Sequence, residues 1–240
     1  DLPPTAFRTE MDRHRRSSLA VVPPSPDDAA WQPLQPQTLV DRVVEAIMAQ
    51  AARGVLLPGD RIGESDIGRK LGVSRVPVRE ALRLLESHGI VINEPYKGIR
   101  LRPLTNRWVK DLVEARTSLE TSAAHRAVDA GHHKGVWVLP LERAIADMDL
   151  MASRGDAYGL AAADTVFHRE LCRLGGNTVI LDLWETLSRQ LTIVFGLATL
   201  GKPMRAIAEE HHDLLKVLMT GDKEAIRSIL HEHITIMNLA

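Results

Sequence analysis

Residues 58–98 of this 240-residue chain have the sequence PGDRIGESDIGRKLGVSRVPVREALRLLESHGIVINEPYKG. The pattern predicts a short helix over about 64–71, a tight turn at Gly72 and a second helix that starts at Ser74. Ser74 is expected to cap the free backbone donors of the second helix, and Pro77 is tolerated in its first turn. Two short helices joined by a glycine turn indicate a helix-turn-helix.

The second helix of this pair has two chemically different faces. Arg75, Arg79 and Arg83 are spaced by four residues, so they share one face. The opposite face is apolar and is expected to be buried; it carries Val78, Ala81, Leu82 and Leu85. A cationic face on the second helix is typical of a recognition helix that enters a DNA groove.

The segment after this helix is predicted to form a two-stranded wing. Residues 90–92 and 99–101 are strand-like, and polar or turn-forming residues separate them. Gly98 is expected to give the wing its tight turn. The wing could reach phosphate or the minor groove with the cationic side chains of Lys97, Arg100 or Arg102.

These pieces occur in one long ordered match, so residues 38–103 are similar to the winged helix-turn-helix of the GntR family of bacterial transcription regulators. The matching segments are 58–62, Glu64, 71–75, 77–82 and 86–90. The resemblance implies a double-stranded DNA operator as partner. The residues expected to serve DNA binding are Ser74, Arg75, Val76, Arg79, Glu64, Ser65, Lys97 and Gly98.

Composition narrows the class of protein. The chain has no run of about 18 apolar residues, so no membrane-spanning helix is expected. The sequence shows no signal-peptide pattern, and a single Cys172 excludes an internal disulfide, which suits a reducing cytoplasm. Cys172 is interpreted as a packing residue in preference to a redox switch, because a second cysteine is lacking.

Charge divides the chain. Residues 61–110 hold 11 Lys+Arg and 5 Asp+Glu, a balance of +6, whereas residues 111–240 hold 13 and 18, a balance of −5. Only the basic part is therefore expected to contact nucleic acid.

Four regions follow from the distribution of proline, glycine and apolar periodicity. Residues 1–36 are expected to form a flexible extension, 37–103 the DNA-binding domain, 104–106 a linker, and 107–240 an all-α bundle of about six helices for effector binding and oligomerisation. The predicted fold class is mostly α, with three helices and a small β wing at the N-terminal end. The bundle helices are expected near 107–130, 135–153, 157–174, 178–199 and 204–220, with the last starting near 223.

The second domain contains a candidate metal site. Asp164 and His168 are four residues apart and face the same side of a helix. Later helices carry four histidines, His211 and His212 on one and His231 and His233 on the next. Aspartate and histidine together can hold Zn²⁺, Ni²⁺ or a similar divalent ion. The spacing alone is a weak signal, because a single histidine on a helix is more often a surface or packing residue.

Residues 107–236 also resemble the helical FCD effector domain of the FadR subfamily. Three landmarks carry the resemblance. The first is residues 111–116 followed by 119–120, and the second is residues 164–168 followed by 176–177. The third comprises residues 210–211, 221–222, Ala225 and His233. By position the resemblance implies a metal held by Asp164, His168, His211 and His233, with Zn²⁺ favoured. His212 and His231 are then surface or supporting residues.

Two further residues are candidates for effector binding, each with an alternative. Arg116 could grip the carboxylate of a small organic acid in two-point fashion, or form an i,i+4 ion pair with Glu120. Asn177 could hydrogen-bond the effector or start a helix.

These residues are compatible with three functions. We expect a homodimeric regulator, and specifically a repressor, whose operator affinity responds to a small carboxylate at the metal. A purely structural metal is the first alternative. A helical metallohydrolase is the second, because His212-Asp213 is the dipeptide of one such family, but an enzyme is not expected.

Overall fold

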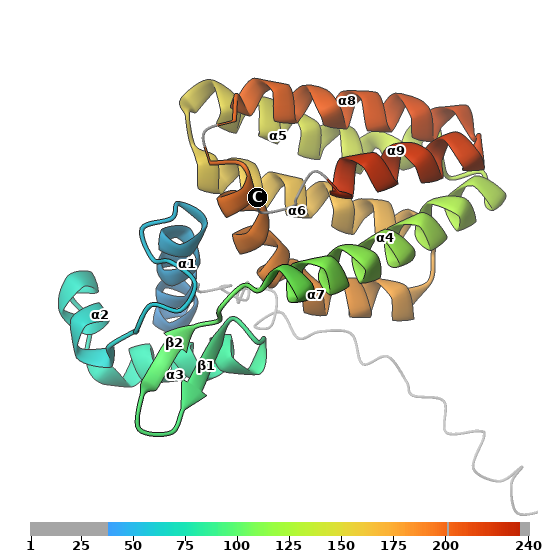
Figure 1. Cartoon of the computed structure of the whole chain (residues 1–240). Helices are drawn as coiled ribbons and strands as arrows, with labels where there is room; N and C mark the ends of the chain where they lie inside the picture. Colours follow the sequence, from blue (N-terminus) through green and yellow to red (C-terminus); the bar gives the residue numbers. More distant parts are fainter. Residues whose placement is uncertain (1–37, 201, 236–240) are drawn as a thin grey trace, which may run out of the picture. The chain divides into compact units, whose positions relative to one another are not determined.

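The computed structural model describes residues 38–200 and 202–235. Figure 1 shows a small module of three helices and a hairpin, followed by a helical bundle. The predicted mostly α fold with a β wing is therefore confirmed. The expected extension, residues 1–36, lies outside the described residues.

The first helix, α1 (Leu39–Ala52), begins at a capping box. The Thr38 hydroxyl accepts from the backbone N–H of Asp41 at 3.1 Å, and the Asp41 carboxylate accepts from the backbone N–H of Thr38 at 3.0 Å. Two backbone donors at the helix start are thereby satisfied. Its buried side chains pack on the next helices and include Val43, Val44, Ile47 and Met48.

The helix-turn-helix consists of α2 (Glu64–Leu71) and α3 (Arg75–Ser87), joined through Gly72 at a positive φ of 67°. Ser74 occupies the cap position of α3, but its side chain makes no capping hydrogen bond, contrary to prediction. Pro77 stands at the third helical position, where the usual donor to a capping hydroxyl would be, and proline has no N–H.

The wing is an antiparallel hairpin of β1 (Val91–Glu94) and β2 (Gly98–Leu101), with Val91 opposite Leu101 and Glu94 opposite Gly98. Both strands begin or end within a residue or two of the predicted runs. Gly98 has a φ of 79°, and Tyr96 at the hairpin end has a φ of 66° and is fully exposed. The predicted turn at Gly98 is confirmed.

The bundle contains six α-helices among the described residues, which agrees with the predicted number. They are α4 (Asn106–Asp129), α5 (Leu139–Arg154), α6 (Ala157–Leu174), α7 (Thr178–Ala198), α8 (Met204–Thr220) and α9 (Lys223–Thr235). Helix α6 packs against α4, α5 and α7, while α4 packs on α9 and α5 on α8 (Figure 1). The buried position of α6 explains why it can present side chains to the bundle interior.

One helix start differs from prediction. The sequence predicts a single helix over about 135–153, but residues Gly135–Val138 form a 3-10 turn and α5 starts at Leu139. Pro140 stands in the first turn of α5, where its missing N–H costs no helical hydrogen bond.

Helix α7 also packs on the N-terminal module. Ile193 belongs to the apolar core that α1 and α3 form, and Gln190 Nε2 donates to the His88 carbonyl at 2.7 Å. A Cβ on Gly196 would lie 2.7 Å from the Ala52 carbonyl oxygen, so only glycine permits this approach of α7 to α1.

Candidate metal centre and DNA-binding surface

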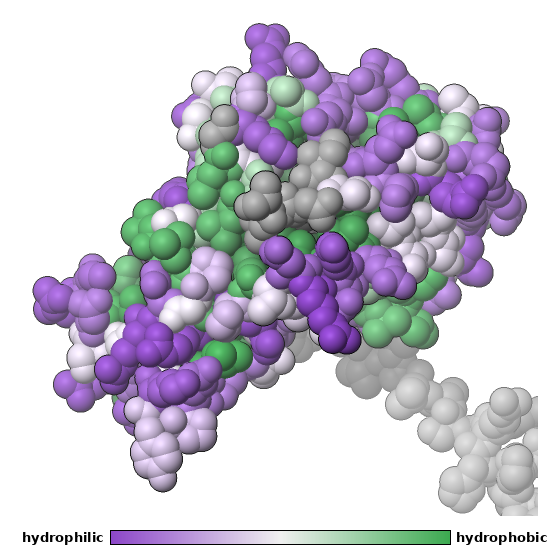
Figure 2. Space-filling view, in the orientation of Figure 1, coloured by the Kyte–Doolittle hydropathy of each residue, from purple (hydrophilic) through white to green (hydrophobic). Residues whose placement is uncertain are grey.

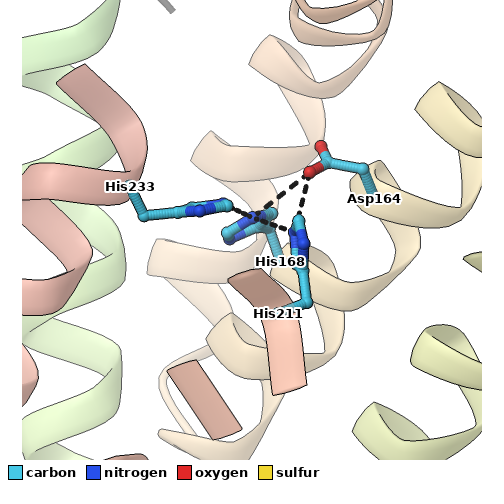
Figure 3. Close-up of side chains that lie close together, drawn as sticks. All are labelled: Asp164, His168, His211 and His233. Atoms are coloured by element: carbon cyan, nitrogen blue, oxygen red, sulfur yellow. Dashed lines mark hydrogen bonds and ion pairs between the residues drawn. The ribbon is translucent and has the colours of Figure 1, made fainter. Parts of the chain in front are cut away.

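Four side chains from three helices meet inside the bundle (Figure 3). Asp164 and His168 lie one turn apart on α6, His211 comes from α8 and His233 from α9. One ligand atom from each lies within 4.8 Å of the other three. Asp164, His168 and His211 are buried, and the side chain of His233 is only 7% exposed.

The distances between the ligand atoms fit a metal. His211 Nε2 lies 2.9 Å from Asp164 Oδ1 and 3.3 Å from His168 Nε2. His168 Nε2 lies 3.6 Å from Asp164 Oδ1 and 3.1 Å from His233 Nε2. Ligands about 2.1 Å from a common ion are separated by roughly 3.0 Å when cis in an octahedron and roughly 3.4 Å in a tetrahedron.

Hydrogen bonds on the far side of two rings fix their tautomers. His168 Nδ1 donates to Glu120 Oε2 at 2.7 Å, and His211 Nδ1 donates to the Ile207 carbonyl at 2.8 Å. A neutral imidazole that donates from Nδ1 keeps its lone pair on Nε2. Both Nε2 atoms face the centre of the cluster, so the rings are oriented as metal ligands require.

Glu120 is the residue that the sequence did not assign to this site. Besides His168, its carboxylate accepts from Arg116 Nε at 2.6 Å and from Trp184 Nε1 at 2.9 Å. Of the two alternatives for Arg116, the structure shows the i,i+4 pair with Glu120, with both side chains fully buried. The contact with His168 spans 48 residues between α4 and α6, and a helix periodicity does not reveal it.

Burial and hydrogen bonding set the charges of the cluster. Burial opposes ionisation of Asp164, but His168 and His211 outweigh it and hold the pKa of Asp164 well below its usual value. Burial likewise opposes ionisation of Glu120, yet Arg116 and His168 lower its pKa to about 2. Burial, followed by the nearby His211 and His168, holds the pKa of His233 well below its usual value.

His168 behaves in the opposite way. Burial and Arg116 lower its pKa, but Glu120 and Asp164 outweigh them, so the pKa lies above the usual value. Two Nε2 atoms only 3.1 Å apart, on His168 and His233, need a proton between them to form a hydrogen bond. A metal-free cluster therefore favours an extra proton on His168.

A small opening of about 20 Å³ adjoins His233. Its other lining residues are Phe195, Ala198, Thr199, Lys202, Ile207 and Glu210. The volume suffices for about one water molecule. A larger ligand can reach the cluster here only if these side chains shift.

The remaining candidates of the bundle lie apart from the cluster. The Asn177 side chain accepts from the backbone N–H of Val179 and Ile180 at 3.0 and 3.2 Å, so it caps α7; its effector role stays a prediction. His212 is exposed and pairs with Asp149, and His231 is exposed on α9. Cys172 is buried, and burial raises the pKa of its thiol.

The dipeptide behind the hydrolase alternative does not contribute to the cluster. His212 pairs with Asp149 at 3.1 Å, and Asp213 pairs with Lys216 at 2.8 Å, both on the exposed side of α8. The predicted ligand His211 precedes them and points inward, because adjacent residues on a helix face different directions.

The predicted DNA-binding residues of α3 are exposed. Ser74, Arg75 and Arg79 lie on the open side of the helix, and Val76 keeps 63% of its surface accessible. Glu64 and Ser65 open α2 beside them, and Glu64 is joined to Arg79. Figure 2 shows that the surface over α2 and the wing is mainly hydrophilic.

The wing uses two of its three cations internally. Arg100 Nη1 donates to the Gly59 carbonyl at 2.8 Å, and Arg102 Nε donates to the Gly89 carbonyl. These bonds fix the backbone around the hairpin and use one nitrogen of each guanidinium, so the suggested phosphate contacts of the two arginines stay predictions. Lys97 is exposed and pairs with Glu94 at 3.2 Å.

Comparison with known families assigns both modules. Residues 39–101 match the model of the bacterial regulatory proteins of the gntR family, and residues 111–235, more than half of the chain, match the FCD domain. The chain belongs to the GntR family of transcription regulators. The cluster of Asp164, His168, His211 and His233 lies within the part of the chain that matches the FCD domain.

Named relatives are transcription regulators. The chain is 32% identical over 210 residues to the probable D-xylose utilization operon transcriptional repressor of Paenarthrobacter nicotinovorans, covering 86% of this chain and 90% of that protein. It is 24% identical over 198 residues to the gluconate operon transcriptional repressor of Bacillus subtilis (strain 168), covering 80% of each. The prediction that this GntR-family chain is a regulator and not an enzyme is confirmed.

A solved structure has the same fold. A GntR regulator from Rhodococcus sp. RHA1 superimposes with a TM-score of 0.65 at 24% identity, over 82% of this chain and 93% of that one. Among the residues described here, every helix is too short or too polar to cross a membrane.

Proposed function

We propose that this DNA-binding regulator is a repressor whose operator affinity changes when a small carboxylate binds a divalent ion at Asp164, His168, His211 and His233. The observation that carries the proposal is the convergence of three imidazole Nε2 atoms and one carboxylate oxygen inside the bundle. Zn²⁺ is the favoured ion and Ni²⁺ the next, because both accept imidazole and carboxylate ligands.

The chemistry of the donor set favours an anionic effector. Three neutral imidazoles and one carboxylate leave a divalent ion with a net positive charge, and such an ion attracts a carboxylate. Lys202 and Glu210 both line the opening beside His233, so their charges balance and the ion itself supplies the attraction. Of the two repressors named above, one is named for the operon of gluconate, a sugar acid, which favours a sugar acid or another hydroxy acid as effector here.

Helix α7 supplies a route from the metal to DNA. Phe195, Ala198 and Thr199 line the opening beside His233. Gly196 and Ile193, from the same stretch of helix, contact the DNA-binding module. Because the opening holds about one water, an organic acid must displace these side chains. A resulting shift of α7 would then move α1, which α7 contacts at Gly196. An effector acts only through different affinities for the two arrangements.

The regulator is proposed to work as a homodimer. One α3 helix covers a single half-site, and a two-fold dimer reads two half-sites about one helical turn apart. Sedimentation of the full chain tests the dimer, and a molecular mass of one chain at the concentration used for DNA binding contradicts it.

The deciding experiment measures DNA affinity with and without metal and acid. The full chain is chelated, reloaded with Zn²⁺ or Ni²⁺, and titrated against duplexes enriched by the protein itself from a random pool, in the presence of D-gluconate or D-xylonate. We expect an acid to change affinity only with metal present. His168→Ala should abolish the response and His231→Ala, an exposed histidine, should preserve it.

A purely structural metal is the alternative that this experiment separates. The buried cluster ties α6 to α8 and α9, which by itself would stabilise the bundle. Chelation would then lower the melting temperature while a broad panel of small acids left DNA affinity unchanged. That pair of results would replace the sensor function with the structural one.

A further inference from the structure

Arg79 is the only arginine of the exposed face of α3 that forms an ion pair with a described residue. The Glu64 carboxylate accepts from Arg79 Nε at 3.1 and 3.2 Å and from Arg79 Nη2 at 2.9 Å. Arg75 and Arg83 form no ion pair within residues 38–200 and 202–235. The three cations of this face are therefore not equivalent.

The geometry of the pair decides which part of the guanidinium remains available. A guanidinium carries one N–H on Nε and two on each terminal nitrogen. Glu64 occupies the edge formed by Nε and Nη2. The edge formed by Nη1 and the second N–H of Nη2 stays open, and the Arg79 side chain is 53% exposed.

Two parallel donors on an open guanidinium edge match one base in the major groove. Guanine presents O6 and N7 as a pair of acceptors, and a bidentate arginine is the commonest specific contact to it. A flexible arginine can offer the same edge, but it can equally turn to a phosphate. Glu64 holds the adjacent edge and thereby restricts that freedom.

We propose that Glu64 is a positioning residue that makes Arg79 read guanine, and that it does so without contacting DNA itself. Glu64 lies at the first position of α2, and its side chain is 26% exposed. The inference rests on the DNA-binding function of the chain and is independent of the metal and effector. Arg75 and Arg83, which no described carboxylate holds, are left to contact phosphate.

A stabilising ion pair is the competing explanation for this contact. The pair joins α2 to α3, and Glu64 also suits the start of a helix. A half-exposed ion pair contributes little to stability, however. A structural role would also weaken all base preferences together, whereas a positioning role affects the base that Arg79 contacts.

The test selects binding sites with full-chain protein from duplexes with about 20 random base pairs, enough for two half-sites one helical turn apart. Wild type is compared with Glu64→Gln, Arg79→Ala and Glu80→Gln, where Glu80 is an exposed carboxylate next to Arg79 on α3 and gives the same charge change. Melting temperatures check that each variant is folded.

We expect Arg79→Ala to lose a guanine preference at one position of each half-site. Glu64→Gln should lower that same guanine preference roughly tenfold and leave the base preference at the other positions unchanged. Glu80→Gln should leave the base preference unchanged at every position. In the Arg79→Ala background, Glu64→Gln should cause no further loss. Replacing that guanine by 7-deazaguanine, which lacks N7, should weaken wild type more than Glu64→Gln.

Three results would overturn the inference. One is a Glu64→Gln variant with the full guanine preference of wild type on the selected sites. Another is an even loss of preference at every position, which would make the pair structural. The last is a wild type that enriches no sequence at all, which would also remove sequence-specific DNA binding from the function of this chain.

Discussion

His168 and Glu120, which are 48 residues apart in the sequence, form a buried hydrogen bond of 2.7 Å between Nδ1 and Oε2. The carboxylate fixes which nitrogen of the ring carries hydrogen and thereby aims the other nitrogen at the metal cluster. Arg116 and Trp184 in turn hold the carboxylate. The candidate metal ligands are thus supported by charged and polar groups that are themselves buried.

Glu120→Gln should lower metal affinity by about 10- to 100-fold, because the amide orients His168 less firmly and makes it a weaker ligand. It should also lower the free energy of unfolding by about 3 kcal/mol, because it breaks the buried ion pair between Glu120 and Arg116. Calorimetric metal titration and urea unfolding measure the two effects. Glu114→Gln, an exposed carboxylate on the same helix, is the control and should change neither.

Metal removal should destabilise the bundle. A ligand present at about 100 times its dissociation constant stabilises the folded state by about 2.7 kcal/mol. We therefore expect chelation to lower the melting temperature by several degrees and Zn²⁺ to restore it. Asp164→Ala should abolish the rise in melting temperature on adding Zn²⁺, whereas His212→Ala, at an exposed histidine, should retain this rise. Equal melting curves for loaded and chelated wild type would argue against any metal in this cluster.

Metal binding should release a proton from His168. Its pKa in the metal-free protein is raised, mainly because Glu120 and Asp164 outweigh burial and Arg116. The stability gained from the protonated ring is present in full below the unfolded pKa of about 6.5 and is lost as pH rises through the higher folded value. Metal and proton compete for the same Nε2, so metal affinity should rise with pH until that folded pKa is passed.

Titration calorimetry in buffers of different ionisation enthalpy measures this release. About one proton per metal is expected below the folded pKa of His168, and none well above it. An affinity that stays constant between about pH 6 and pH 8 would contradict the protonated cluster.

Gly196→Ala should weaken communication between the bundle and the DNA-binding module. The added methyl would meet the Cβ and the carbonyl oxygen of Ala52 at 2.7 Å, so α7 and α1 must separate. We expect metal affinity to be preserved, because Gly196 does not line the cluster, while the effect of an acid on DNA affinity decreases. Ala162→Gly, on the partly buried side of α6, serves as a small-residue control. An unchanged acid response would mean that α7 does not carry the signal.

Arg75→Ala should weaken binding to all DNA sequences alike. A phosphate contact carries no base information, and its loss lowers the slope of log affinity against log salt by about 1. Affinities for a selected site and for random DNA between 50 and 200 mM salt, about the range where such effects are largest, provide the measurement. A change confined to one base position would instead give Arg75 a role in base reading.

Local patterns were enough to predict most of the fold. The bounds of α2, α6 and α8 agree with prediction because capping residues, glycines and prolines mark the helix ends. The candidate metal ligands were predicted through the family resemblance, and the choice of His211 over His212 agrees with the inward position of His211. Such features depend on residues near one another in sequence or on the order of motifs along the chain.

Contacts between elements could not be predicted in this way. Glu64 and Arg79 were both candidates for DNA binding, yet their pairing depends on how α2 crosses α3. Glu120 was considered only as a partner for Arg116, because its contact with His168 needs the packing of α4 on α6. The missing cap of Ser74 was predictable in principle, since Pro77 removes the donor that a capping hydroxyl would use.

The position of His233 has a consequence for the synthesis of this protein on the ribosome. Asp164 and His168 are made on α6 and His211 on α8, but the fourth ligand comes from α9, the last helix described. A nascent chain that has already folded its DNA-binding module would lack a complete metal site until residue 233 has emerged. Truncated chains could then bind operators without being able to respond to the effector. Proteolysis of such fragments would therefore be more important than for a regulator whose effector domain is synthesised first.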